Sequence, residues 1–171
     1  YGRTFAPDGT LWQAEISDGT YDGAPAPDEL VRVEAGDDFG WPQCIGDRLP
    51  VEFYDGTDDR CANTPRSHAL FDPGSTPTSV AVAPWNDNVL LVSLWVQSRI
   101  VAVPAASGDD TSSSAPDSSG PSGTDDDGGP VEYTDFITGI ERPQFLLADG
   151  DRLLVVDYGG GRIVAVTEST G

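Results

Sequence analysis

The sequence contains no lysine and no methionine, and it has one histidine and two cysteines among its 171 residues. All nine basic residues are arginines, against 22 aspartates and seven glutamates, and the formal net charge is −20. Nucleic acids and anionic membrane surfaces both bind clustered lysine and arginine, so this charge argues against both partners. No apolar stretch approaches the roughly 20 residues of a membrane-spanning helix. We therefore expect no nucleic-acid partner and no membrane span in this chain.

The acidity of the chain is spread over its whole length. Residues 104–130 hold six of the 22 aspartates, and removing these six charges changes −20 only to −14. A dense acidic surface without lysine keeps a protein hydrated when salt screens its charges. We therefore expect a protein from a high-salt organism; the alternative is acidic drift in a GC-rich genome plus one acidic loop. Because the chain lacks methionine, we also expect a processed product or a piece of a longer protein.

Residues 104–130 form a low-complexity segment of Ser, Gly, Pro and Asp, whose composition predicts a disordered surface insert. The segment could link two domains, but its flanks repeat each other. LLVSLWVQSRIVAV at 90–103 matches LLVVDYGGGRIVAV at 153–166, 63 residues further on. Subtracting the 27-residue insert leaves 36 residues, close to a β-propeller blade of about 40. The insert is therefore predicted on the rim, between blades of one domain.

The strand pattern predicts an all-β fold. Residues 6–19 with 27–33 form a looser third copy, and each copy predicts two antiparallel strands bounded by turn residues. Helical periodicity is nearly absent, and Gly159–Gly161 is predicted as a hairpin turn, because no helix follows it. The predicted fold is a partial β-propeller of about three four-stranded blades. Since closed propellers need about 4–8 blades, residues 1–171 are interpreted as the C-terminal part of one propeller domain.

Three blocks, in this order, resemble the glucose/sorbosone dehydrogenase family: FAPDGTLW at 5–12, PDELVRVEAGDDFGWPQC at 27–44 and FITGIERPQFLLADGDRLLVVDYGGGRIVAV at 136–166. That family comprises six-bladed propellers that use pyrroloquinoline quinone (PQQ) and calcium to oxidise sugars outside the cytoplasm. The resemblance implies a small sugar as substrate and an external electron acceptor. The family's catalytic histidine and its Arg-Asn-Pro motif fall upstream of Tyr1. No catalytic residue is therefore assigned here, and this piece alone is expected to be inactive.

The resemblance implies two sets of calcium contacts. One set is the Glu29 carboxylate with the backbone carbonyl of Phe39, and Asp28 could add a further carboxylate. The other is the pair of backbone carbonyls of Ser17 and Asp18, where many relatives have Gly-Pro. Calcium accepts hard oxygen ligands of both kinds. The alternatives are a solvated turn before a strand and an ordinary Ser-Asp-Gly hairpin turn.

The resemblance also implies contacts to the quinone. Arg142 resembles a quinone-binding arginine, and a guanidinium suits the three carboxylates of PQQ. A second arginine of the family is replaced by Ile140, so the expected clamp is weaker. The alternative is a surface arginine paired with Glu141 or Asp135.

His68 stands where related proteins also carry a histidine before a proline-containing run, which implies a cofactor contact. The alternative is a loop histidine bonded to a backbone carbonyl. The lysine that binds the quinone in some relatives has no counterpart near residues 94–99 of this chain. Trp95, which stands in that stretch, is the best candidate for stacking on a sugar ring.

Cys44 and Cys61 enclose 16 residues and are predicted to form one disulfide; the alternative is two buried free thiols. Together with the resemblance, a disulfide favours an extracellular, periplasmic or cell-surface protein.

The rival function is a non-catalytic extracellular propeller module that binds sugar or protein. A homodimer is left open.

Overall fold

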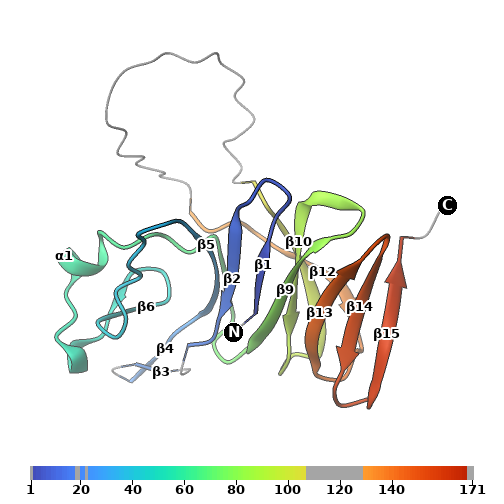
Figure 1. Ribbon diagram of the computed structural model, residues 1–171. Coiled ribbons are helices and arrows are strands. Elements are labelled where there is room, and N and C mark those ends of the chain that lie inside the picture. The colour runs from blue at the N-terminus through green and yellow to red at the C-terminus, as the bar shows by residue number, and fades with distance from the viewer. Residues whose placement is uncertain (1, 18–19, 22, 107–128, 169–171) are drawn as a thin grey trace, which may run out of the picture.

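The computed structural model describes residues 2–17, 20–21, 23–106 and 129–168. Three antiparallel sheets stand side by side in these residues (Figure 1). The first blade contains β1 (Arg3–Phe5), β2 (Leu11–Glu15), β5 (Asp28–Val33) and β8 (Ala69–Phe71). The second contains β9 (Pro77–Ala83), β10 (Asn86–Leu94), β11 (Arg99–Pro104) and β12 (Thr134–Thr138). The third contains β13 (Pro143–Asp149), β14 (Arg152–Asp157) and β15 (Arg162–Thr167).

The sequence repeat corresponds to one hairpin used in successive blades. Leu90 of β10 pairs with Val103 of β11, and Leu153 of β14 pairs with Val166 of β15, so the two copies share the same register. The looser copy supplies β2 and β5, which pair in the first blade. The predicted all-β partial propeller of about three blades is therefore confirmed.

Each blade packs its apolar face against the next blade, because successive side chains of a strand point to opposite faces of the sheet. The first core lies between the first two blades and joins Trp12 and Leu30 to Val92 of β10. The second core joins Leu91, the neighbour of Val92, to Leu153 of the third blade. β10 is thus buried on both faces, which explains its nearly continuous apolar sequence. The backbone just before β1 approaches β9 so closely that a Cβ on Gly2 would lie 2.3 Å from Ser79 Cα.

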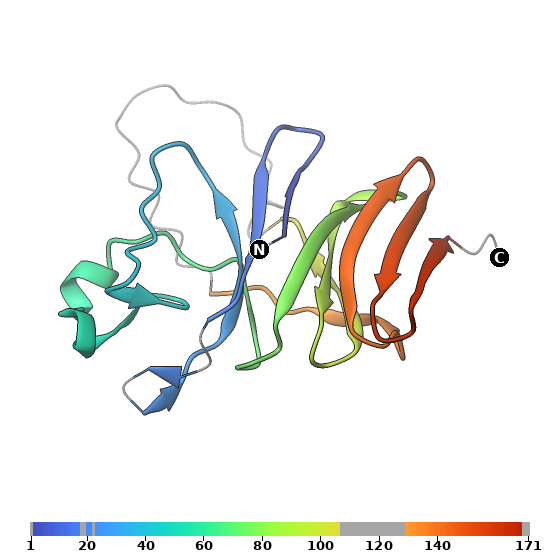
Figure 2. The ribbon, with the colours of Figure 1, turned by 60° about the horizontal axis from the view of Figure 1, so that its bottom comes forward.

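Two features of the first blade lie outside its four strands. A small hairpin, β3 (Thr20–Tyr21) with β4 (Ala24–Pro25), stands between β2 and β5. Residues 34–68, here called the disulfide loop, leave the blade after β5 and return at β8. The loop contains β6 (Cys44–Ile45), β7 (Leu49–Pro50), a 3₁₀ turn (Glu52–Tyr54) and α1 (Asp58–Cys61). It lies at the end of the arc opposite the third blade, as both views show (Figure 2).

The structure differs from the expectation of four-stranded blades at the third blade, which has three strands within the described residues. Its outer face leaves Phe145, Leu147 and Ile163 between 50% and 69% exposed. Most of the predicted disordered insert, residues 107–128, lies outside the described residues. No helix in the described part of the chain is long and apolar enough to cross a membrane.

Candidate functional site

A cavity of about 290 Å³ lies between the first blade and the disulfide loop. Its lining includes Glu15 at the end of β2, Ser17 just after that strand, Glu29 on β5, and Phe39 and Trp41 of the disulfide loop. Three residues implied as calcium contacts, Ser17, Glu29 and Phe39, are therefore brought to one place. The fourth, Asp18, lies outside the described residues.

Two carboxylates lie side by side in the wall of this cavity. Glu15 of β2 and Glu29 of β5 are directly opposite each other in the antiparallel register, which places their Cβ atoms roughly 5 Å apart. The Gln13 amide donates a hydrogen bond to Glu15, and the Ser67 hydroxyl donates one to Glu29. Like charges in this position repel each other, so the pair favours either a proton or a bound cation.

Glu29 carries an electrostatic penalty, because its side chain is almost fully buried. Burial raises the pKa of Glu29 from its ordinary 4.5 to about 7, although the hydrogen bond from Ser67 opposes the shift. The negative charges of Glu15, Asp47 and Asp28 act in the same direction as burial. A cation in the cavity would relieve this penalty.

The donor set for such a cation is small. No group of three or more His, Cys, Asp or Glu side chains that could hold a metal occurs among the residues that the structure describes. Glu15 and Glu29 would supply two carboxylate ligands, so backbone carbonyls or water would have to complete the shell. Calcium accepts both kinds of oxygen, and the residues of the cavity fit it on this basis.

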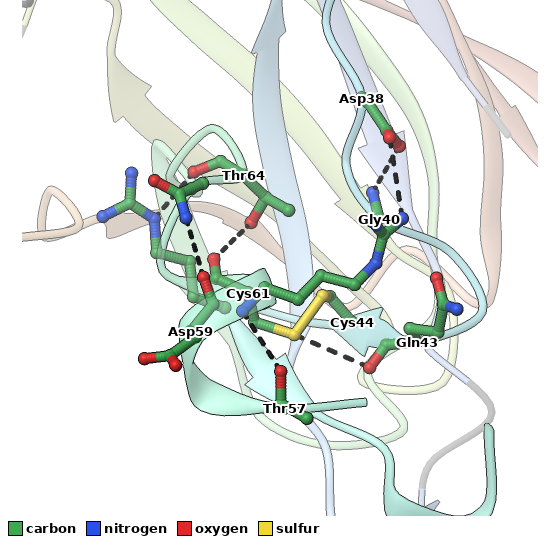
Figure 3. Close-up of a disulfide and its surroundings, with 11 residues drawn as sticks. Asp38, Gly40, Gln43, Cys44, Thr57, Asp59, Cys61 and Thr64 are labelled. Atoms are coloured by element: carbon green, nitrogen blue, oxygen red, sulfur yellow. Dashed lines mark hydrogen bonds and ion pairs between the residues drawn. A yellow bond between two sulfur atoms is a disulfide. The ribbon is translucent and has the colours of Figure 1, made fainter. Parts of the chain in front are cut away.

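The disulfide fixes the part of the loop that carries Phe39. Cys44 of β6 is bonded to Cys61 of α1 (Figure 3), which confirms the predicted disulfide. The Cys44 amide donates to the Gly40 carbonyl, and the Gly40 amide donates to Asp38. Gly40 has a φ of +79°, and a Cβ there would lie 2.8 Å from Cys44 Sγ, so only glycine fits. Phe39 is thus held beside the cavity by a turn that packs on the disulfide.

Asp28, the possible extra calcium ligand, is engaged elsewhere. Its side chain is fully buried, and its two oxygens accept the backbone N–H groups of Ser17 (2.8 Å) and Thr76 (2.7 Å). Burial raises the pKa of Asp28, and the hydrogen bonds from these backbone amides oppose the shift. Sequence reasoning did not identify this contact, because Thr76 is 48 residues away along the chain.

Arg142 lies between the second and third blades, at the start of β13. Its guanidinium is 4.9 Å from the centre of the Trp95 ring, and its side chain is exposed. Asp135, one of the two anionic partners considered for it, pairs with Arg99 at 2.8 Å instead. Ile140, at the position of the family's second arginine, is buried in the second core. Arg142 therefore provides an accessible cation beside an aromatic ring.

His68 lies elsewhere in the fold. Its Nε2 is 2.6 Å from the Pro104 carbonyl oxygen, and its ring packs edge-on against Trp12 at 4.6 Å. Pro104 ends β11, whereas Trp95 precedes the start of that strand. His68 and Arg142 are thus at opposite ends of β11, and the structure does not bring them together. The contact of His68 with a carbonyl agrees with the alternative considered for it, and its cofactor role stays a prediction.

No protein-family model and no curated protein sequence matches the chain. Solved structures do match its fold. The PQQ-bound form of an aldose sugar dehydrogenase from Streptomyces coelicolor matches 96% of this chain with a TM-score of 0.60 and 19% identity. The holo form of the PQQ domain of a pyranose dehydrogenase from Coprinopsis cinerea matches 98%, with a TM-score of 0.66 and 19% identity. A structure from Thermus thermophilus that is described as an oxidoreductase (glucose dehydrogenase) matches 90%, with a TM-score of 0.57 and 18% identity.

The match covers nearly all of this chain but only 41%, 53% and 36% of those three chains, respectively. Identities of 18–19% establish the fold and nothing finer. The chain therefore shares the fold of sugar dehydrogenases that include PQQ-bound forms, as the resemblance of its sequence implied, and it spans about half of their length or less.

Proposed function

We propose that this chain is part of a PQQ- and calcium-dependent dehydrogenase that oxidises a small sugar and passes the electrons to an external acceptor. The observation that carries the proposal is the convergence of Ser17, Glu29 and Phe39 on one acidic cavity. The resemblance names these residues independently of their position in space. The fold shared with a PQQ-bound aldose sugar dehydrogenase supports the same function.

The cavity residues would hold calcium in this proposal. Glu29 would supply a buried carboxylate and Phe39 a backbone carbonyl, and the resemblance implies that the backbone carbonyls of Ser17 and Asp18 would add further ligands. Glu15, opposite Glu29, increases the negative potential. The bound cofactor would supply a quinone able to accept a hydride from the sugar, and the bound calcium would supply Lewis-acid polarisation of that quinone.

Arg142 would bind a carboxylate of the cofactor. Its guanidinium is exposed and is oriented by Trp95, so it can offer paired N–H donors to an anion. The resemblance places the histidine that accepts the hydroxyl proton of the sugar upstream of Tyr1, and His68, the one histidine of this chain, contacts the Pro104 carbonyl oxygen. The chain thus binds and orients, and the reaction requires further blades.

Calcium binding is the direct test. Isothermal titration of the chain with CaCl₂ in molar KCl should show one site that is lost in Glu29→Gln and retained in Glu132→Gln, a matched change at an exposed glutamate. The whole protein that contains this chain should then oxidise aldoses in a dye-linked assay only with PQQ and Ca²⁺. Absence of calcium binding by the wild-type chain would contradict the proposed metal site, and absence of PQQ-dependent oxidation would contradict the dehydrogenase.

A second candidate is a non-catalytic propeller module that binds sugar or protein. The burial of Ile140 in place of a second quinone-binding arginine favours it. Calcium binding without PQQ binding would select this module.

For both candidates we propose an extracellular, periplasmic or cell-surface location, because disulfides persist in oxidising compartments. The charge of −20 supports a high-salt environment.

A further inference from the structure

Asp28 joins two loops that the proposed function uses separately. Through Ser17 it contacts the loop that lines the acidic cavity, and through Thr76 it contacts the segment that leads into β9 of the second blade. Ser17 is fixed further, because its hydroxyl donates to the Pro27 carbonyl at 2.7 Å. One buried carboxylate therefore connects the first blade to the second at the end where the cavity lies.

The connection continues from Thr76 to Arg142. The Trp95 amide donates to the Thr76 carbonyl at 3.0 Å, and the neighbouring Val96 amide donates to the Ser75 carbonyl at 3.2 Å. The Trp95 ring in turn lies 4.9 Å from the Arg142 guanidinium carbon. Four consecutive contacts thus link the cavity loop to the proposed cofactor arginine.

Thr76 is the strained step in this path. Its φ is +59°, a left-handed conformation that a β-branched residue rarely adopts. Such a conformation persists only where the surroundings enforce it. The hydrogen bond from the Thr76 amide to Asp28 is one such restraint, so loss of the carboxylate should let Thr76 relax and move the backbone that anchors Trp95.

We propose that Asp28 is a positioning residue, which holds the loop of the acidic cavity and the Trp95–Arg142 pair in one fixed relation. Its importance for cofactor binding rests on the proposed function, but the positioning itself does not. In this role Asp28 contacts neither the calcium ion nor the cofactor. It acts through the amides of Ser17 and Thr76.

The test compares two buried aspartates by NMR in molar KCl. Asp28→Asn keeps one acceptor and places an NH₂ group against an amide donor. Asp157→Asn is the matched control, because Asp157 is also buried and accepts the Gly160 amide and Arg162 Nε in a local turn of the third blade. The readout is the indole N–H resonance of Trp95, with Arg142→Gln as the reference for a disrupted pair. A general loss of stability would affect both aspartate variants alike.

The expected result is that Asp28→Asn moves the Trp95 resonance towards its position in Arg142→Gln, whereas Asp157→Asn leaves it in place. Calcium affinity should fall by about 10–100-fold in Asp28→Asn, the usual cost of losing an outer-shell partner. An unmoved Trp95 resonance in Asp28→Asn overturns the proposal, whether or not calcium binds. If the resonance moves but the wild-type chain binds no calcium, the positioning stands and the proposed calcium site fails.

A measurement on the wild-type chain covers the case in which Asp28→Asn does not fold. Hydrogen exchange of the Ser17 and Thr76 amides should be at least tenfold slower than in an unstructured peptide of the same sequence. Exchange at the unstructured rate would overturn the proposal, because both amides must then lack the carboxylate contact.

Discussion

The pH dependence of stability provides a quantitative test of the acidic cavity. Folding raises the pKa of Glu29 from 4.5 to about 7 through burial, so the folded state holds a proton that the unfolded state has released between these two values. Stability must therefore fall as the pH rises from 4.5 to about 7, and it changes no further above that range. At 1.36 kcal/mol per pKa unit, the loss attributable to Glu29 is about 3 kcal/mol.

Urea unfolding at fixed molar salt, at pH values between 4.5 and 7.5, measures this loss. Glu29→Gln removes the titrating group, so the stability difference between wild type and variant should change by about 3 kcal/mol across the range. The exposed Glu132→Gln should show a constant difference, which separates Glu29 from the general repulsion of a chain with a charge of −20. If the difference in unfolding free energy between wild type and Glu29→Gln does not change with pH, the reasoning that this carboxylate is desolvated is refuted.

Three further results are expected. Replacing Cys44 and Cys61 by serine should cost about 3 kcal/mol in urea unfolding and weaken calcium binding; unchanged calcium affinity would show that the loop keeps its shape without the bond. Phe145→Asp should lower the binding of the dye ANS, because the side chain is 52% exposed on the open apolar face of the third blade; unchanged dye binding would contradict that exposure. Arg142→Gln should cost no more than about 1 kcal/mol of stability while weakening PQQ binding, because its contact with Trp95 is exposed; unchanged PQQ affinity would remove Arg142 from the cofactor site.

The fold was predictable because its signal repeats. The second and third blades use the same hairpin, so the two copies predicted the spacing of the blades, and the structure adds their shared register. The helix α1 was missed because four residues are too few for an apolar period. Its local signal is the N-cap Thr57, whose hydroxyl accepts the Arg60 amide.

The candidate site was only partly predictable, for a physical reason. Glu29 and Phe39 were found because the resemblance fixes their spacing along one stretch of chain. Glu15 could have been found from pairing alone, since the predicted antiparallel strands place it opposite Glu29. The contact between Asp28 and Thr76 crosses between blades, and no local pattern encodes it. The distance between His68 and Arg142 likewise depends on how the blades are arranged.

The exposed carboxylates of this chain and the buried carboxylate of Glu29 should respond differently to salt. Exposed carboxylates repel one another across solvent, where molar salt reduces the Debye length to about 3 Å and removes most of the repulsion. Glu29 is almost fully buried and faces Glu15 at close range, so mobile ions screen that pair far less. Salt alone should therefore stabilise the surface without neutralising the cavity. Added Ca²⁺ should still raise the unfolding free energy of the wild-type chain in molar KCl, by about 2.7 kcal/mol at 100 times its dissociation constant. If KCl alone reproduces that gain, the cavity is open to mobile ions and Glu29 does not need a bound divalent cation.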